Sequence, residues 1–156
     1  MFANILVPLD GSALSEHALP MAQHLARSSD TALHLLQVIS LRPELDALRG
    51  SGSESVTVLE MAQDAARRLR EAQTARGQAY LEGLAVPLQH AGINVTTALR
   101  EGAADENILA YAQEHAIDLI VMSTHGYSGF KRFFLGSVTD RVIRAGQTPV
   151  LVVPAS

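Results

Sequence analysis

Five short apolar runs, separated by longer segments of helix-forming composition, constrain the fold of this chain more than any other feature. Each run has the length of a strand and is apolar at most positions, which is typical of strands buried in a parallel sheet. An alternation of strand and helix calls for an α/β protein with a parallel sheet and helices on both faces. The runs predict strands at residues 4–9, 31–39, 93–99, 118–122 and 149–154.

The alternation also predicts the strand order. If the first strand is central in a doubly wound sheet, strands two and three lie on one side of it and strands four and five on the other. We therefore predict a five-stranded sheet in the order 3-2-1-4-5, within a single domain over residues 1–156. The winding reverses between the first and fourth strands, and ligands bind such sheets at the carboxyl ends of the strands there. Residues 10–12 and 123–137 follow these two strands, so we predict a ligand-binding crevice between them.

All but one of the segments between the strands have helix-forming or turn-and-helix compositions. The exception is residues 41–55, which contain Pro43, Gly50, Gly52 and three serines. Such a composition favours a flexible insertion loop. The other segments predict helices at residues 12–28, 56–91, 104–115 and 137–145.

Proline and glycine are expected to disturb two of these helices. Ser12 is the predicted N-cap of the first helix, and Pro20 lies inside it. Because proline removes one backbone hydrogen bond, we expect a bend at Pro20 rather than a second helix. The second helix is expected to bend or break at Gly77, Gly83 and Pro87.

The stretch after the fourth strand has the composition of an anion-binding loop. Gly126, Gly129 and Gly136 allow a phosphate to approach the backbone closely. Ser137 is placed both to cap the next helix and to donate its hydroxyl to a phosphate oxygen. Free N–H groups and the positive end of the helix dipole favour an anion there. From spacing alone, a tight strand-to-helix connection without a ligand remains the alternative.

Three further polar residues in this stretch keep more than one interpretation. His125 is either a phosphate ligand, a catalytic acid or a packing residue. Lys131 and Arg132 either neutralise phosphate charge or belong to a solvated surface. The residue types alone do not separate these roles.

Composition and charge exclude several classes of function. Without cysteine, the chain has no disulfides, thiolate chemistry or cysteine-ligated metal. Its net charge of −4 gives no general attraction to nucleic acid or an anionic membrane. No apolar run is long enough to span a bilayer, and the N-terminus has no signal-peptide pattern, so we expect a cytoplasmic protein. The histidines are scattered, and His17 and His24 are too far apart on one helix to share an ion, so no metal site is predicted.

At this point the sequence resembles the universal stress protein family. The resemblance covers nearly the whole chain and implies a Rossmann-like fold of the adenine nucleotide alpha hydrolase type. It also implies a protein that binds ATP, with Mg²⁺. It is carried by Val7-Pro8-Leu9-Asp10-Gly11-Ser12, by Leu36-Gln37-Val38-Ile39, by Ser123-Thr124-His125-Gly126 with nine residues to Gly136-Ser137, and by the ending from Thr148 to Pro154.

The resemblance also assigns roles to individual residues. The ATP-binding branch has glycine, two residues, glycine, nine residues, glycine and then serine or threonine. Ser123 stands where the first glycine is expected; its side chain either crowds a nucleotide or is accommodated if φ is negative. By analogy, Asp10 holds the ribose or adenine side, Val38 offers backbone groups to adenine, and the glycine loop carries the phosphates. The nucleotide site predicted in this way is Pro8, Asp10, Val38, Ser123, His125, Gly126, Gly129, Gly136, Ser137 and Val138.

Three classes of function remain. We favour an ATP-binding stress-response or regulatory module that hydrolyses ATP slowly at most and reports through unidentified protein partners. The alternatives are an ATP hydrolase or phosphoryl transferase at the same site, and a nucleotide-free dimeric interaction protein. No catalytic residue is assigned, because Asp10 is the only acidic residue predicted in the crevice and catalysis needs a positioned base and a metal.

The last strand predicts a homodimer. In the expected order it is an edge strand, and it lacks the charges that usually protect an edge. Two such edges can pair antiparallel about a two-fold axis, and the resemblance implies the same mode. Pro149 and Pro154 limit the length of the pairing. The predicted contact residues are Val150, Leu151, Val152 and Val153.

Overall fold

The structure is a computed structural model that describes residues 2–27, 30–40, 56–125 and 136–155. The predicted insertion loop at residues 41–55 lies outside the described residues. In chain order the elements are β1 (Asn4–Leu9), α1 (Ala13–Glu16), α2 (Leu19–Leu25), β2 (Ala32–Ile39), α4 (Val56–His90), β3 (Asn94–Glu101), α5 (Ala104–Glu114), β4 (Leu119–His125), α6 (Ser137–Ala145) and β5 (Val150–Ala155).

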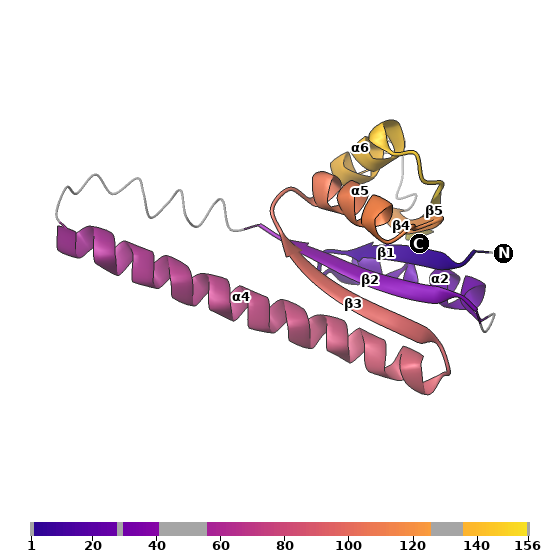
Figure 1. The fold of residues 1–156 in the computed structure, drawn as a ribbon, viewed down its shortest axis with the longest axis horizontal. Coiled ribbons are helices and arrows are strands. Elements are labelled where there is room, and N and C mark those ends of the chain that lie inside the picture. Colours follow the sequence, from indigo (N-terminus) through magenta and orange to yellow (C-terminus); the bar gives the residue numbers. More distant parts are fainter. Residues whose placement is uncertain (1, 28–29, 41–55, 126–135, 156) are drawn as a thin grey trace.

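The five strands form one parallel sheet in the order β3-β2-β1-β4-β5 (Figure 1). This confirms the predicted order and the central position of β1. In the register of the sheet, Leu6 of β1 lies opposite His34 of β2 and Ile120 of β4. The carboxyl ends of β1 and β4 are therefore neighbours at the point where the winding reverses.

Helices cover both faces of the sheet, as predicted (Figure 1). On one face, Ile5, Val7 and Val121 pack into a core with residues of α2 and α4. On the other face, Leu6 and Ile120 pack with residues of α5 and α6. All five of these strand side chains are fully buried. Because successive side chains of a strand point to opposite faces, an apolar run supplies both cores at once.

The first predicted helix is two helices. The chain forms α1 and α2 with a break at His17 and Ala18, whose amides bond to the carbonyls of Leu14 and Ser15. The expectation of a bend without a second helix was therefore wrong. Pro20 lies in the first turn of α2, where a backbone N–H has no helical partner to lose, so the proline starts a helix instead of bending one. The predicted N-cap, Ser12, is confirmed at α1.

Helix α4 is continuous over 35 residues, so the expected break at Gly77, Gly83 or Pro87 is wrong (Figure 1). Gly77 has a packing role: a Cβ there would lie 2.8 Å from a methyl group of Leu99 and 3.1 Å from Gln37 Oε1. Its missing side chain lets α4 approach β2 and β3 closely. Buried residues on the following turns, Leu81, Ala85 and Leu88, hold the C-terminal part of the helix on the sheet, and this packing outweighs the low helix propensity there.

A polar cluster joins α5 to the sheet away from the strand ends. His34 of β2 is buried, and its Nδ1 lies 3.0 Å from the Tyr111 hydroxyl of α5. The Tyr111 ring stacks on His115 and lies under the guanidinium of Arg100, which also pairs with Glu114. Burial, together with the charge of His115, lowers the pKa of His34. These contacts fix α5, whose first turns reach the carboxyl end of the sheet.

Candidate functional site

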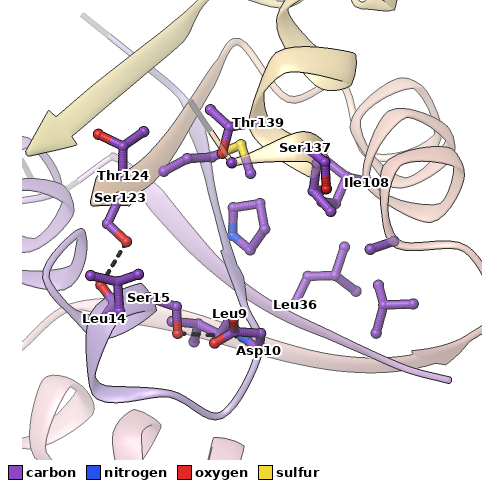
Figure 2. A pocket seen from close by; sticks show the side chains of 16 residues that line it. Leu9, Asp10, Leu14, Ser15, Leu36, Ile108, Ser123, Thr124, Ser137 and Thr139 are labelled. Carbon is purple, nitrogen blue, oxygen red and sulfur yellow. Dashed lines mark hydrogen bonds between the residues drawn. The ribbon is translucent and has the colours of Figure 1, made fainter. Parts of the chain in front are cut away.

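A pocket of about 240 Å³ opens at the carboxyl ends of β1, β2 and β4, which is the place predicted for the crevice (Figure 2). Residues of α1, α5 and α6 complete its walls. Its lining consists of Pro8, Leu9, Asp10, Leu14, Ser15, Leu36, Val38, Ala104, Ile108, Met122, Ser123, Thr124, Gly136, Ser137, Val138 and Thr139.

The turn after β1, residues 10–15, is held by its own polar groups. Asp10 Oδ1 accepts hydrogen bonds from the amide and the hydroxyl of Ser12, at 2.9 and 2.5 Å. The Ser12 hydroxyl oxygen accepts from the Ser15 amide, and the Ser15 hydroxyl donates to the Ser12 carbonyl. Gly11 has a φ of +83°, a conformation that other residues rarely adopt. The turn therefore presents Asp10 and Ser15 to the pocket in one geometry.

These hydrogen bonds also set the charge state of Asp10. Burial alone would raise the pKa of its carboxyl, but the hydrogen bonds from the Ser12 hydroxyl and amide, together with weaker contributions from the Ser15 hydroxyl and the Asp10 amide, hold the pKa below its ordinary value of 3.8. The carboxylate is therefore ionised at neutral pH. Among the described pocket residues it is the only acidic or basic side chain.

The N-terminus of α6 forms the opposite corner of the pocket. Gly136 is the N-cap, and no side chain among the described residues caps the helix by a hydrogen bond. The predicted cap, Ser137, is instead the first helical residue, because the Asp140 amide makes its helical bond to the Gly136 carbonyl. The amides of the first helical residues have no partner within the helix. They lie beside the pocket, together with the positive end of the helix dipole.

Ser123 lies inside β4 and not in the following loop, because β4 extends through His125 alongside β5. Its φ is negative, because Ala116 is the only non-glycine residue with a positive φ in the described part of the chain. The Ser123 hydroxyl donates a 2.6 Å hydrogen bond to the Leu14 carbonyl of α1 (Figure 2). The side chain is thus accommodated against α1, although it still contributes to the pocket wall.

The remaining wall is apolar. Leu36 and Val38 come from β2, Ile108 from α5, Met122 from β4, and Pro8 from β1. Such a surface suits a flat, weakly polar group such as a heterocyclic base, whereas the polar corners suit hydroxyl and phosphate groups. The two chemistries lie within one pocket.

The pocket brings together most of the residues predicted from the sequence. Gly126 and Gly129 lie outside the described residues, as do Lys131 and Arg132. His125 ends β4, and its side chain is not part of the description. The seven predicted residues that line the pocket are Pro8, Asp10, Val38, Ser123, Gly136, Ser137 and Val138.

The sequence reasoning missed nine lining residues. Ser15 had a usable signal, since it follows the predicted N-cap Ser12 by three residues and can close a capping turn. Ala104 and Ile108 had none, because the segment before α5 carries no motif and its position depends on how α5 packs. The nine are Leu9, Leu14, Ser15, Leu36, Ala104, Ile108, Met122, Thr124 and Thr139.

Two kinds of feature are absent from the described part of the chain. Residues 2–27, 30–40, 56–125 and 136–155 contain no group of three or more His, Asp or Glu side chains placed to hold a metal ion. In those same ranges, no helix has the length and apolarity needed to cross a membrane.

Strand β5 forms one edge of the sheet. Its neighbour is β4, with Val121 opposite Leu151 and Ser123 opposite Val153. The four apolar residues named for dimerisation, Val150, Leu151, Val152 and Val153, are all partly exposed.

Solved structures with the same fold include proteins with bound nucleotides. The chain is similar to the structure of MJ0577, with a TM-score of 0.79 and 28% identity over 100% of this chain and 98% of that one. It has the fold of a universal stress protein in complex with cAMP, with a TM-score of 0.58 and 23% identity over 99% and 98% of the two chains. It also has the fold of an Arabidopsis thaliana family member with AMP bound, with a TM-score of 0.66 and 16% identity over 99% and 92%.

Sequence comparisons identify the family directly. Universal stress protein YxiE of Bacillus subtilis is 33% identical over 153 residues, which are 98% of this chain and 99% of that protein. Universal stress protein MJ0531 of Methanocaldococcus jannaschii is 30% identical over 98% of this chain and 82% of its own length. The profile of the Universal stress protein family matches residues 1–154. The chain therefore belongs to the universal stress protein family.

Proposed function

We propose that this protein is a cytoplasmic, homodimeric stress-response module that binds ATP with Mg²⁺, hydrolyses it slowly at most, and reports through other proteins. The main support for the proposal is that one pocket contains two different polar corners, the turn after β1 and the N-terminus of α6. Asp10 lies at the end of β1, and the α6 N-terminus lies across from it, with apolar side chains between them. A nucleotide combines the same three chemistries: a flat base, a hydroxyl-bearing sugar and an anion.

The orientation of the nucleotide follows from the charges. Phosphate oxygens are stabilised at the N-terminus of α6 by free amides, the helix dipole and the Ser137 hydroxyl. The ionised Asp10 repels phosphate and accepts hydrogen bonds from sugar hydroxyls, so it belongs at the nucleoside end. The base then packs on the apolar wall that includes Leu36 and Val38.

Magnesium fits this arrangement through the nucleotide. Mg²⁺ commonly binds through one or two carboxylates and the phosphates of a substrate. The described pocket offers one carboxylate, Asp10, and the hydroxyls of Ser137 and Thr139. The phosphate oxygens would therefore be its main ligands, and its chemistry is charge neutralisation.

Slow hydrolysis is expected because the described pocket lacks a general base near the phosphate end. Its only carboxylate lies at the nucleoside corner and is fully ionised and hydrogen-bonded. Rapid phosphate release by the purified protein, lost in Asp10→Asn, would favour the hydrolase or phosphoryl-transferase alternative.

Mass spectrometry of purified, denatured protein, followed by calorimetric titration of the nucleotide-free protein, tests the function. We expect release of an adenine nucleotide from the denatured protein. We also expect ATP to bind with a Kd in the micromolar range, which corresponds to a binding free energy on the order of −8 kcal/mol. If no adenine nucleotide is released and none binds at millimolar concentration, the protein is better described as a nucleotide-free interaction module.

The dimer is proposed to form through β5. This strand is an exposed edge with four consecutive apolar residues, and two copies can join their edges antiparallel. Light scattering at micromolar concentration should give the mass of two chains. Val152→Lys should shift the protein to the monomer, whereas a monomeric wild type would contradict this part of the proposal.

A further inference from the structure

Ser123 makes a hydrogen bond that joins two walls of the pocket. Its hydroxyl donates to the Leu14 carbonyl at 2.6 Å, although the two residues are 109 positions apart in the sequence. Figure 2 shows this contact between the end of β4 and α1. Ser123 and Thr124 line the pocket from β4, whereas Leu14 and Ser15 line it from α1.

The helix on the receiving side has little stability of its own. α1 has only four residues, and none of them is buried. A helix of one turn does not persist without tertiary contacts. At its start it is tied to the turn after β1 through Ser12, and at its end Glu16 accepts a 3.0 Å hydrogen bond from the Tyr80 hydroxyl of α4. Neither of these contacts connects α1 to β4.

Among the side-chain hydrogen bonds of the described residues, the Ser123 bond is the one that joins α1 to β4. Glycine and alanine at position 123 have no donor for it. Without the bond, α1 keeps its packing against β1 and β4 and its hydrogen bond to α4, but it loses its side-chain hydrogen bond to β4. Leu14 and Ser15 would then be less restrained relative to Thr124.

We propose that Ser123 is a positioning residue that holds α1 against the end of β4 and so sets the width of the pocket. Its predicted effect on a ligand rests on the proposed function, because the bond would organise Leu14 and Ser15 before a nucleotide binds. Binding to an unrestrained α1 would have to order that helix, which weakens affinity.

Hydrogen exchange in the ligand-free protein tests the positioning role by itself. The amides of His17 and Ala18 bond to the Leu14 and Ser15 carbonyls, so they report on α1. Loss of one hydrogen bond should accelerate their exchange about 2- to 12-fold in Ser123→Ala and Ser123→Gly. Ser123→Thr retains the hydroxyl and should exchange like wild type. Thr97→Ala, which removes an exposed hydroxyl from β3, is the matched control and should also exchange like wild type.

The proposal is overturned if the α1 amides exchange at the wild-type rate in Ser123→Ala and Ser123→Gly. It is also overturned if these amides exchange as fast in Ser123→Thr as in those two variants. It is also overturned if the buried Leu35 amide of β2 accelerates equally, because that result would indicate a global loss of stability.

Calorimetric titration with ATP gives the second readout. Ser123→Ala and Ser123→Gly should weaken ATP binding about 2- to 12-fold, and Ser123→Thr should restore it. If wild type binds no adenine nucleotide, the proposed function fails while hydrogen exchange still decides the positioning role. If wild type binds and all three variants bind equally well, the proposed function stands and the role of Ser123 in binding is refuted.

Discussion

The two polar corners of the pocket use their hydrogen-bonding groups differently. In the turn after β1, Asp10, Ser12 and Ser15 satisfy one another through five hydrogen bonds that involve their side chains, within six residues. At the N-terminus of α6, no side chain from the described part of the chain caps the helix. The first corner is already organised without a ligand, whereas the second has amides that a ligand can satisfy. Preorganisation and binding capacity are thus located in separate parts of the same pocket.

The largest effect is expected from a substitution that disrupts the sheet from which both corners of the pocket extend. Val121 is fully buried at the centre of β4. Val121→Asp buries an unpaired charge and should cost about 3–5 kcal/mol of unfolding free energy, measured by urea denaturation. Val56→Asp, at a position with 71% exposure, is the control and should change stability little. Equal unfolding midpoints for Val121→Asp and wild type would contradict the assigned centre of the sheet.

The next largest effect is expected from a substitution at the α6 corner that should weaken ATP binding without disturbing the fold. A Cβ at Gly136 would meet no atom of the described residues within 4 Å, and φ there is −51°, so a side chain can be built without backbone strain. Gly136→Val should therefore fold but weaken ATP binding at least about 100-fold, because the branched side chain occupies the space proposed for phosphate. Gly83→Val, at another position with open space, should bind like wild type.

Wild-type affinity in Gly136→Val would show that phosphate does not bind at this corner. Loss of binding accompanied by loss of thermal stability would instead indicate a structural role for Gly136. Circular dichroism melting alongside the titration distinguishes the two results.

A smaller effect tests whether the turn after β1 is organised by the charge of Asp10. Its pKa is lower in the folded protein than the usual 3.8. Because the Asp10 pKa is lower in the folded than in the unfolded chain, its ionised carboxylate adds to the free energy of unfolding above the unfolded-state pKa. This added stability is lost as the pH falls through the folded-state pKa. Asp10→Asn should therefore be less stable than wild type at pH 6, by no more than about 1 kcal/mol because water screens the exposed carboxylate, and the difference should narrow below pH 3.8.

Urea denaturation at several pH values measures this narrowing. Ser12→Ala removes the hydroxyl hydrogen bond that lowers the Asp10 pKa, and it also removes the acceptor of the Ser15 amide. In Ser12→Ala, the free energy of unfolding should therefore vary less with pH than in wild type. A stability difference that is constant from pH 6 to pH 3 would mean that the charge of Asp10 does not organise the turn.

The smallest effect concerns one hydroxyl at the α6 corner. Because Gly136 is the N-cap, Ser137→Ala leaves the helix cap intact and removes only a donor to phosphate. ATP binding should weaken about 2- to 12-fold, with an unchanged melting temperature. A loss of thermal stability in Ser137→Ala would indicate that this hydroxyl serves the fold and would remove the contrast between the two corners.

The sequence alone determined the strand order, the layers and the position of the pocket. Apolar runs buried on both faces and right-handed crossovers are local or general constraints, so Asp10 and Ser137 could be placed in one crevice without coordinates. The Ser12 cap and the bounds of α6 were also predictable, because capping and helix signals act over a few residues.

Only the tertiary structure decided the features that depend on distant contacts. Gly77 lets α4 approach the sheet closely, and buried side chains on later turns keep the helix continuous through Gly83 and Pro87. Packing of α5 brings Ile108 to the pocket, and pairing with β5 extends β4 through Ser123. The bond from Ser123 to Leu14 then crosses 109 residues of chain. Local sequence preferences contain no information about such partners, because each contact exists only when both elements are already in place.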